Sequence, residues 1–336
     1  ILLASKQLGY IPNLQARNLK SKKSTSIGII IPSIANPFYP SIVRGIEDEI
    51  VSRNYHMSIS SCDRDKERIN YSIENMLAVN VQGIISIYID EIPEAMFRLV
   101  KRGGVALNVV SNGICIPDMH TIMVDKVEEC ELAVQHLLDL GHRDVAFITP
   151  PLTRRQWQRS KRVDGFVQEV EKAGLSGHVI IRAADESVDR RNPKTDSEYS
   201  MGYALTRSLL EDGSRFTAIA GQNDMMAIGA VDALQDARLR VPKDVSVIGC
   251  DNIFYSGIRR VSLTTIDHFV DLKGRDACDI IIRKIDTGIR FGEGIRPTSV
   301  YNIEYNPKII VRKTTGYARM DKPDPINEKS EENKFK

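Results

Sequence analysis

The stretch SIGIIIP, residues 26–32, is a continuous apolar run that ends in proline, and DVAFITP, residues 144–150, has the same character. Short apolar runs bounded by turn residues are typical of strands that are covered on both faces, as in parallel sheets. Each run is followed by segments whose patterns alternate between helix and strand. We therefore interpret the two runs as the opening strands of two α/β units that are built in the same way.

The alternation extends outward from both runs. After the first run we expect a helix from Phe38 to about Arg53, the strand HMSISSC, the helix RINYSIENMLAVN and the strand GIISIY. After the second run we expect the helix RVDGFVQEVEKAG, the strand HVIIR, the helix SMGYALTRSLLED, the strand FTAIAG, the helix MMAIGAVDALQDA and the strand DVSVIGC. This order predicts an α/β fold of two lobes, each a parallel sheet flanked by helices. Ligands bind at the carboxyl ends of such strands, so two facing lobes would form a binding cleft.

Positive charge is concentrated at one end of the chain. Residues 1–25 contain five basic side chains and no acidic one, whereas the whole chain nets +2, so the remainder nets −3. Within this segment ILLASKQL is typical of a helix end closed by Gly9, and NLQARNLK suits about two helical turns with Asn13 as the N-cap. Lysine and arginine attract phosphates, so nucleic acid is a candidate partner. A solvated basic linker is the alternative.

Composition and motifs disfavour several classes of protein. The five cysteines are widely spaced with no CxxC pair, which favours reduced thiols over disulfides or a zinc site, and we expect neither a metal nor a cofactor. No apolar run is long enough to span a membrane, and the N-terminus lacks the pattern of a signal peptide. The motifs GxGxxG, GxxxxGK[ST], HExxH and GxSxG are absent, and we interpret Asp267 and His268 as a chance pair, so no enzyme is expected.

Motifs with the order and spacing of one protein family run through most of the chain. They are LGYIPNLQARNLK, IGIIIPSIANPFYPSIVRGIE, HLLDLGHRDVAFI, RVDGF, TAIAGQNDMMAIGAVDAL, VPKDVSVIGCDN, LTTI and IIVRKTT, and they extend from Ile1 to about Thr315. In these motifs the sequence resembles the lac-repressor (LacI/GalR) family of bacterial transcription regulators. The resemblance implies two lobes of the periplasmic-binding-protein type, a small effector in the cleft, a homodimer and a DNA-binding headpiece. It also places the helix with Ile42, Ile46 and Ile50 near the dimer interface, although most of that apolar stripe is predicted to face the sheet.

By this resemblance the chain has three parts. Residues 1–25 would hold the third helix of the headpiece and a hinge helix, residues 26–320 the effector-binding and dimerisation domain, and residues 321–336 a disordered tail. The first lobe would span about 26–150 and 268–296, and the second about 151–267 and 297–320. The helix-turn-helix would lie upstream of Ile1, so we expect a piece of a longer protein. Hinge positions that match DNA contacts are Asn13, Ala16, Arg17, Leu19 and Lys20, with Leu19 as the apolar wedge in the minor groove.

Positions that match the family's effector contacts supply what a sugar-like ligand needs, namely carboxylates, donors and an aromatic face. They are Asn36 and Phe38 in the first lobe, and Arg162, Asn223 and Asp251 in the second. Asp125, at the end of a first-lobe strand, could also face the cleft, and Trp157 could stack on the ligand. Each has a structural alternative. Phe38 could be core, Trp157, on the loop after VAFITP, could pack at the rim, and Asn223 or Asp224 could cap the next helix. Arg162 and Asp251 could form a surface ion pair.

Two departures from the family pattern affect the expected cleft. Cys250 and Asn252 flank Asp251, where the family usually has an aromatic residue and a second aspartate, and Lys126 follows Asp125, where asparagine is common. Both departures change the set of hydrogen-bonding groups. The effector could therefore be phosphorylated or otherwise anionic if Lys126 faces inward.

The function implied is that of a cytoplasmic bacterial repressor, associated with the nucleoid through operator DNA, dimeric, and without a membrane partner. A sugar or sugar derivative would control its DNA affinity by preferring one arrangement of the lobes. The alternative is an exported sugar-binding protein of a transport system. Such a protein would share the two-lobed fold but carry a signal peptide and no basic hinge.

Overall fold

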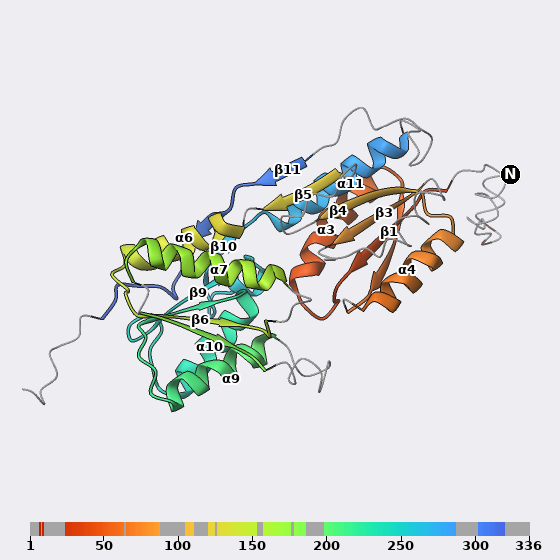
Figure 1. The fold of residues 1–336 in the computed structure, drawn as a ribbon. Helices are drawn as coiled ribbons and strands as arrows, with labels where there is room; N and C mark the ends of the chain where they lie inside the picture. The colour runs from red at the N-terminus through yellow and green to blue at the C-terminus, as the bar shows by residue number, and fades with distance from the viewer. Residues whose placement is uncertain are drawn as a thin grey trace, which may run out of the picture. The chain divides into compact units, whose positions relative to one another are not determined.

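The computed structural model of the 336-residue chain describes residues 7, 9, 24–63, 65–87, 105–110, 120–124, 126–152, 157–175, 178–185, 198–286 and 302–319. The chain forms two compact units (Figure 1), residues 1–124 with 269–305, and residues 125–268 with 306–336. The expected boundaries are wrong, because the second unit begins at Asp125 rather than at residue 151 and resumes at Asn306 rather than at 297. The physical reason is packing: the helix at residues 126–139 contacts the second sheet and its helices.

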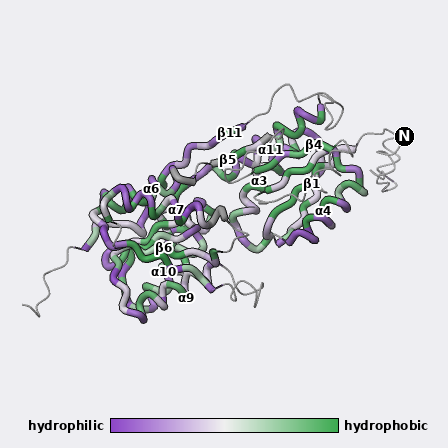
Figure 2. The backbone as a smooth tube through the Cα atoms, in the orientation of Figure 1, coloured by the Kyte–Doolittle hydropathy of each residue, from purple (hydrophilic) through white to green (hydrophobic). Residues whose placement is uncertain are grey.

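In the first unit the described residues form a sheet of six parallel strands in the order β11-β5-β4-β3-β1-β2. The strands are β1 (Ser26–Ile31), β2 (His56–Ser61), β3 (Gly83–Ile87), β4 (Ala106–Val110), β5 (His120–Val124) and β11 (Asn302–Tyr305), and the helices are α3 (Phe38–Ser52), α4 (Lys66–Ala78) and α11 (Val270–Asp286). Ile42, Ile46 and Ile50 of α3 are buried, which confirms that the apolar stripe is core. Figure 2 shows β1 coloured as a hydrophobic strand.

In the second unit the described strands are ordered β12-β10-β9-β8-β6-β7, all parallel except β12. The strands are β6 (Val145–Thr149), β7 (Val179–Ala183), β8 (Ala218–Gly221), β9 (Ser246–Cys250), β10 (Thr264–Asp267) and β12 (Lys308–Ile310). The helices are α6 (Lys126–Asp139), α7 (Trp157–Lys172), α9 (Glu198–Glu211) and α10 (Asp224–Asp236), with the 3₁₀ turn η3 (Phe254–Gly257).

In the second unit, alternate residues of each central strand pack into different core layers, one on each face of the sheet. Phe147 of β6 belongs to the cluster formed with α6 and α7, whereas Ala146 and Ile148 belong to the cluster formed with α9 and α10. Because successive strand side chains point to opposite faces, a strand with helices on both sides must be apolar throughout. This requirement explains the continuous run in DVAFITP.

Helices α9 and α10 approach closely at two glycines. A Cβ atom on Gly202 would lie 2.1 Å from the carbonyl oxygen of Met226, and one on Gly229 would lie 2.1 Å from that of Tyr199. Only a residue without a side chain permits such backbone proximity. Helices α3 and α11 of the first unit meet at glycines in the same way.

The elements expected from SIGIIIP through DVSVIGC are confirmed, with small shifts at their ends. Trp157 begins α7 rather than lying on a loop, which corrects its expected position. Gln7 is helical and Gly9 has φ of +64°, as the predicted helix end requires. The other headpiece and hinge residues and the tail lie outside the described residues, so they stay predictions. No helix among the described residues is long and apolar enough to cross a bilayer.

The buried Lys284 of α11 is expected to make stability depend on pH. Burial lowers the pKa of this amine from 10.5 to about 8. Between these pH values the unfolded chain binds more protons than the folded chain, so stability rises with pH across this window and is lowest below pH 8. Lys284→Met should therefore raise the free energy of unfolding at pH 7 by about 2 kcal/mol. It should also reduce the increase of that free energy between about pH 8 and pH 10.5.

Urea unfolding at pH 7 and pH 10 measures this effect. The matched control is Arg283→Met, because Arg283 neighbours Lys284 on the helix but is exposed, in an ion pair with Asp279. That substitution should change stability by less than about 1 kcal/mol at either pH. Equal pH dependence in Lys284→Met and the parent protein would contradict the prediction.

Candidate functional site

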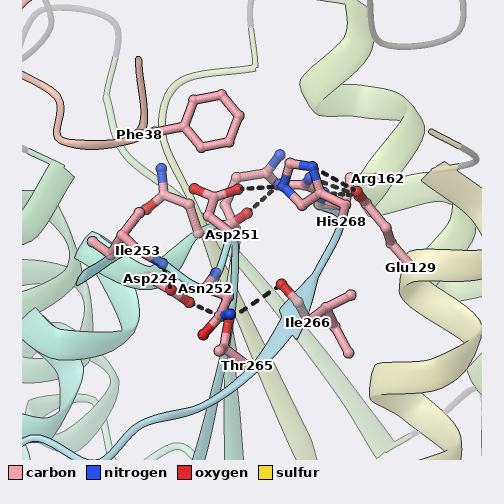
Figure 3. A network of polar contacts seen from close by, with 12 residues as sticks. Phe38, Glu129, Arg162, Asp224, Asp251, Asn252, Ile253, Thr265, Ile266 and His268 are labelled. Carbon is pink, nitrogen blue, oxygen red and sulfur yellow. Dashed lines mark hydrogen bonds and ion pairs between the residues drawn. The ribbon is translucent and has the colours of Figure 1, made fainter. Parts of the chain in front are cut away.

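Four buried polar side chains meet at the carboxyl ends of the central strands in the second unit (Figure 3). Asp251 directly follows β9 and His268 directly follows β10, while Arg162 lies on α7 and Glu129 on the first turn of α6. The carboxyl edge of a parallel sheet is where loops leave the strands and where ligands bind. The topology thus brings together residues that are far apart in the sequence.

Arg162 is held by two partners inside the unit. Its Nε and Nη2 donate to Oε2 of Glu129 at 3.2 and 2.7 Å, and its Nη1 donates to the carbonyl oxygen of Gln222 at 2.5 Å. Burial alone would lower the pKa of this guanidinium, but the charges of Cys250, Glu129 and Asp251 outweigh burial and raise it. The considered surface ion pair with Asp251 is wrong, since Arg162 is buried and pairs with Glu129.

His268 lies between two carboxylates. Its Nε2 is 3.2 Å from Oδ1 of Asp251, and its Nδ1 is 4.0 Å from Oε1 of Glu129. Sequence reasoning missed both Glu129 and His268, and interpreted His268 only through its neighbour Asp267. No local signal could have revealed the cluster, because its members come from α6, from α7 and from the ends of two strands.

The backbone at Asp251 and Asn252 has unusual conformations, with φ of +134° and +51°. Such values are costly for residues other than glycine, by about 1–3 kcal/mol, and are maintained where surrounding contacts demand them. Those contacts are present: the Asp251 N–H donates to the Ile266 carbonyl at 2.9 Å, and Arg312 donates to Oδ1 of Asn252 at 2.6 Å. The turn after β9 is therefore held in one conformation.

Asn223 and Asp224 were both considered as caps of α10, and only Asn223 has that role. Asn223 is the N-cap of α10, because its Oδ1 accepts from the N–H of Met226 at 3.0 Å, and its Nδ2 donates to Glu198 at 2.7 Å. Capping by Asp224 is wrong. Asp224 is fully buried and accepts from the backbone N–H of Ile253 and from hydroxyl groups of β10 and η3. Burial raises its pKa, and these hydrogen bonds offset the rise only in part.

The two first-unit candidates lie on the segment after β1, also at the carboxyl edge of their sheet. Oδ1 of Asn36 accepts from the N–H of Phe38 at 2.9 Å and so helps to start α3. The Phe38 ring is largely buried and packs edge-on against Tyr39, with ring centres 5.2 Å apart. These contacts give both residues a structural role within the unit.

The remaining candidates lie outside the described residues, in whole or for their side chains. They are Asn13, Ala16, Arg17, Leu19, Lys20 and Asp125, and the side chains of Lys126 and Trp157. Their assignment to DNA or effector contacts stays a prediction.

A small pocket of about 20 Å³ adjoins the network. Glu129, Arg162 and Cys250 line it together with apolar residues of α6, α7 and the sheet. A volume of this size suits one water molecule rather than a sugar. This pocket by itself is therefore not an effector site.

Comparison with known proteins identifies relatives with transcriptional roles. Residues 134–315 match the model of the periplasmic binding protein-like domain. The chain is 32% identical to catabolite control protein A of Priestia megaterium over 79% of this chain and 76% of that protein. It is 30% identical to the ribose operon repressor of Escherichia coli K12 over 84% of this chain and 82% of that protein.

A solved structure supports the fold. It is a LacI-family transcriptional regulator from Enterococcus faecium with bound ribose, which shares 23% identity and a TM-score of 0.73, and the match covers 88% of this chain and 100% of that one. The described strands form two largely parallel sheets, as the expected fold requires, and two relatives are at least 30% identical over more than two thirds of the chain. The chain belongs to the LacI/GalR family of transcriptional regulators.

Proposed function

We propose that this protein is a transcriptional repressor whose affinity for operator DNA is set by a small effector of the sugar class. The observation that carries the proposal is the buried set of Arg162 and Asp251 at the carboxyl ends of the second sheet's strands, in a chain related to sugar-operon repressors. The ribose in the Enterococcus faecium regulator supports the choice of ligand class.

The hydrogen-bonding capacity of the site suits hydroxyl groups. An arginine has five N–H groups, and the contacts with Glu129 and Gln222 use three of those on Arg162. The other two can donate to a ligand, while Asp251 can accept from ligand hydroxyls. Glu129 and Gln222 already fix the guanidinium of Arg162. This side chain therefore loses little conformational entropy when a ligand binds, which favours affinity.

The DNA-binding part of the proposal rests on the basic segment 1–25. A hinge helix of about two turns is marginal alone and would fold when bound to DNA and to the hinge of a second chain. In this proposal the repressor is a homodimer in the bacterial cytoplasm, located at the nucleoid through its operator. Asn13, Ala16, Arg17, Leu19 and Lys20 would contact the minor groove, and Asn36, Phe38, Asp125, Trp157 and Asn223 would complete the effector site.

Thermal unfolding in the presence of a panel of sugars and sugar phosphates tests the effector. A ligand at a hundred times its dissociation constant should add about 2.7 kcal/mol of stability. Arg162→Ala should weaken that ligand at least about tenfold, because it removes charged hydrogen bonds of about 1.5–3 kcal/mol each. Each shift is measured against the same variant without ligand, which separates binding from the loss of Glu129's partner.

The matched control is Arg182→Ala. Arg182 lies on β7 of the same unit and pairs with Asp212 and Ser208, away from the network. Its ligand-induced shift should equal that of the parent protein. A shift that survives in Arg162→Ala would show that the effector binds elsewhere, and no shift with any compound would contradict the sugar class.

A further inference from the structure

Three buried side chains of the second unit offer metal-ligand atoms to one point. They are Glu129 on α6, Cys250 at the end of β9 and His268 after β10, and each is no more than 5% exposed. Their ligand atoms all lie within 4.8 Å of one another. Polar groups of this kind are rarely buried together unless a charge or a metal compensates their desolvation.

The distances suit a transition-metal ion after a small contraction. A triangle with sides of 4.8 Å has its centre about 2.8 Å from each corner, whereas zinc bonds measure roughly 2.0–2.3 Å. Each ligand atom would therefore move by less than about 1 Å. The side chains need no change of backbone to do so, because each pivots from the end of a strand or the first turn of a helix.

The surrounding groups are oriented as a metal site requires. A histidine that binds a metal commonly donates its other ring N–H to a carboxylate. Nε2 of His268 lies 3.2 Å from Oδ1 of Asp251, and Nδ1 is directed toward Glu129. Arg162 bonds only Oε2 of Glu129 in the contacts described, and Oε1 is the oxygen nearer to the histidine. Asp251 thus supports the histidine, while Glu129 would bind the ion through Oε1.

The charges around the proposed ion balance, and the neighbouring pocket has room for a fourth ligand. A divalent ion with Arg162 supplies three positive charges, which match the carboxylates of Glu129 and Asp251 and a Cys250 thiolate. The thiol proton would leave as the ion binds. The pocket of about 20 Å³ beside Glu129 and Cys250 has room for one water as a fourth ligand, the number usual for zinc.

We propose that Glu129, Cys250 and His268 bind a divalent transition-metal ion of the zinc type. The ligand set of thiolate, imidazole and carboxylate favours zinc or cobalt over magnesium or calcium, which prefer oxygen ligands alone. The inference does not rest on the proposed function, because a metal can be detected without DNA or effector. An occupied site would stiffen Arg162 and Asp251.

Titration of the metal-free full chain with Co²⁺ tests the site. We expect one ion per chain, a thiolate-to-cobalt charge-transfer band, and displacement of the cobalt by Zn²⁺. Cys250→Ser should abolish the charge-transfer band, and Asp251→Asn should weaken cobalt binding by about 10–100-fold through the histidine. Circular dichroism verifies that each variant is folded.

Cys278→Ser is the matched control, because Cys278 is also a fully buried cysteine but lies in the first unit. Its cobalt spectrum should equal that of the parent chain. X-ray absorption of the parent protein with cobalt bound reports one sulfur ligand independently of any variant. Absence of the band, or a band that persists in folded Cys250→Ser, would overturn the proposal.

Discussion

Asp224→Ala is expected to lower the free energy of unfolding of the second unit by about 3–5 kcal/mol. Oδ2 of Asp224 accepts from the Ile253 N–H at 3.0 Å and from the Ser256 hydroxyl at 2.5 Å, and Oδ1 accepts from Thr265 at 2.5 Å. Alanine leaves these donors without their acceptor in a site closed to water. Each donor that finds no new partner costs about 1–3 kcal/mol.

The substitution should also disturb the candidate site. Ile253 and Ser256 lie on the segment that directly follows Asp251 and Asn252, which both have positive φ. Asp224 fixes that segment to the start of α10, so its loss releases a conformation that is costly by itself. We therefore expect effector or metal binding to weaken in Asp224→Ala even under conditions where the protein is folded.

Urea unfolding, with intrinsic fluorescence and circular dichroism compared, measures the effect. Asp224→Asn keeps the shape and one acceptor and should be intermediate. The matched control is Asp236→Ala, on the same helix but exposed and bonded only to the Tyr203 hydroxyl among the contacts described. A loss in Asp224→Ala as small as that in the control would refute the structural role.

Gly229→Ala is expected to destabilise the same unit by about 3 kcal/mol. Alanine is the better helix former by about 0.5–1 kcal/mol, so the substitution would stabilise the unit if the new Cβ atom had room. The new Cβ would lie 2.1 Å from the Tyr199 carbonyl oxygen and 2.8 Å from the Tyr203 nitrogen, and both are backbone atoms of α9. They cannot rotate away, so the helices must separate and the clash outweighs the gain in propensity.

Two further variants sharpen this prediction. Gly257→Ala is the control, because a Cβ there would have its nearest neighbour 4.0 Å away, at Nη2 of Arg312, which is an ordinary van der Waals contact. It should change stability by less than about 0.5 kcal/mol. Gly202→Ala places a Cβ atom between the same two helices, on the side of α9. The double variant should lose less stability than the sum of the two single variants, because one separation of the helices relieves both overlaps. Full additivity would contradict a shared contact.

The sequence by itself determined the two α/β units. SIGIIIP and DVAFITP are continuous apolar runs, and a strand covered on both faces has no other pattern available. It also determined the family, because motifs from one end of the chain to the other retain their order. The strands β4, β5, β10, β11 and β12 and the helices α6 and α11 were not among the elements predicted from the alternating pattern. For the strands the reason is that segments of three to five residues carry little periodicity.

Only the tertiary structure decided the site. Arg162 and Asp251 were identified in the sequence, but the resemblance could not reveal that Arg162 pairs with Glu129 and that Asp251 pairs with His268. Nor could spacing show that Asn223 caps α10 while Asp224 is a buried acceptor for three donors. The reason is that parallel strands bring their carboxyl ends to one edge from distant parts of the chain, so the partners of a site residue follow from sheet order and not from sequence distance.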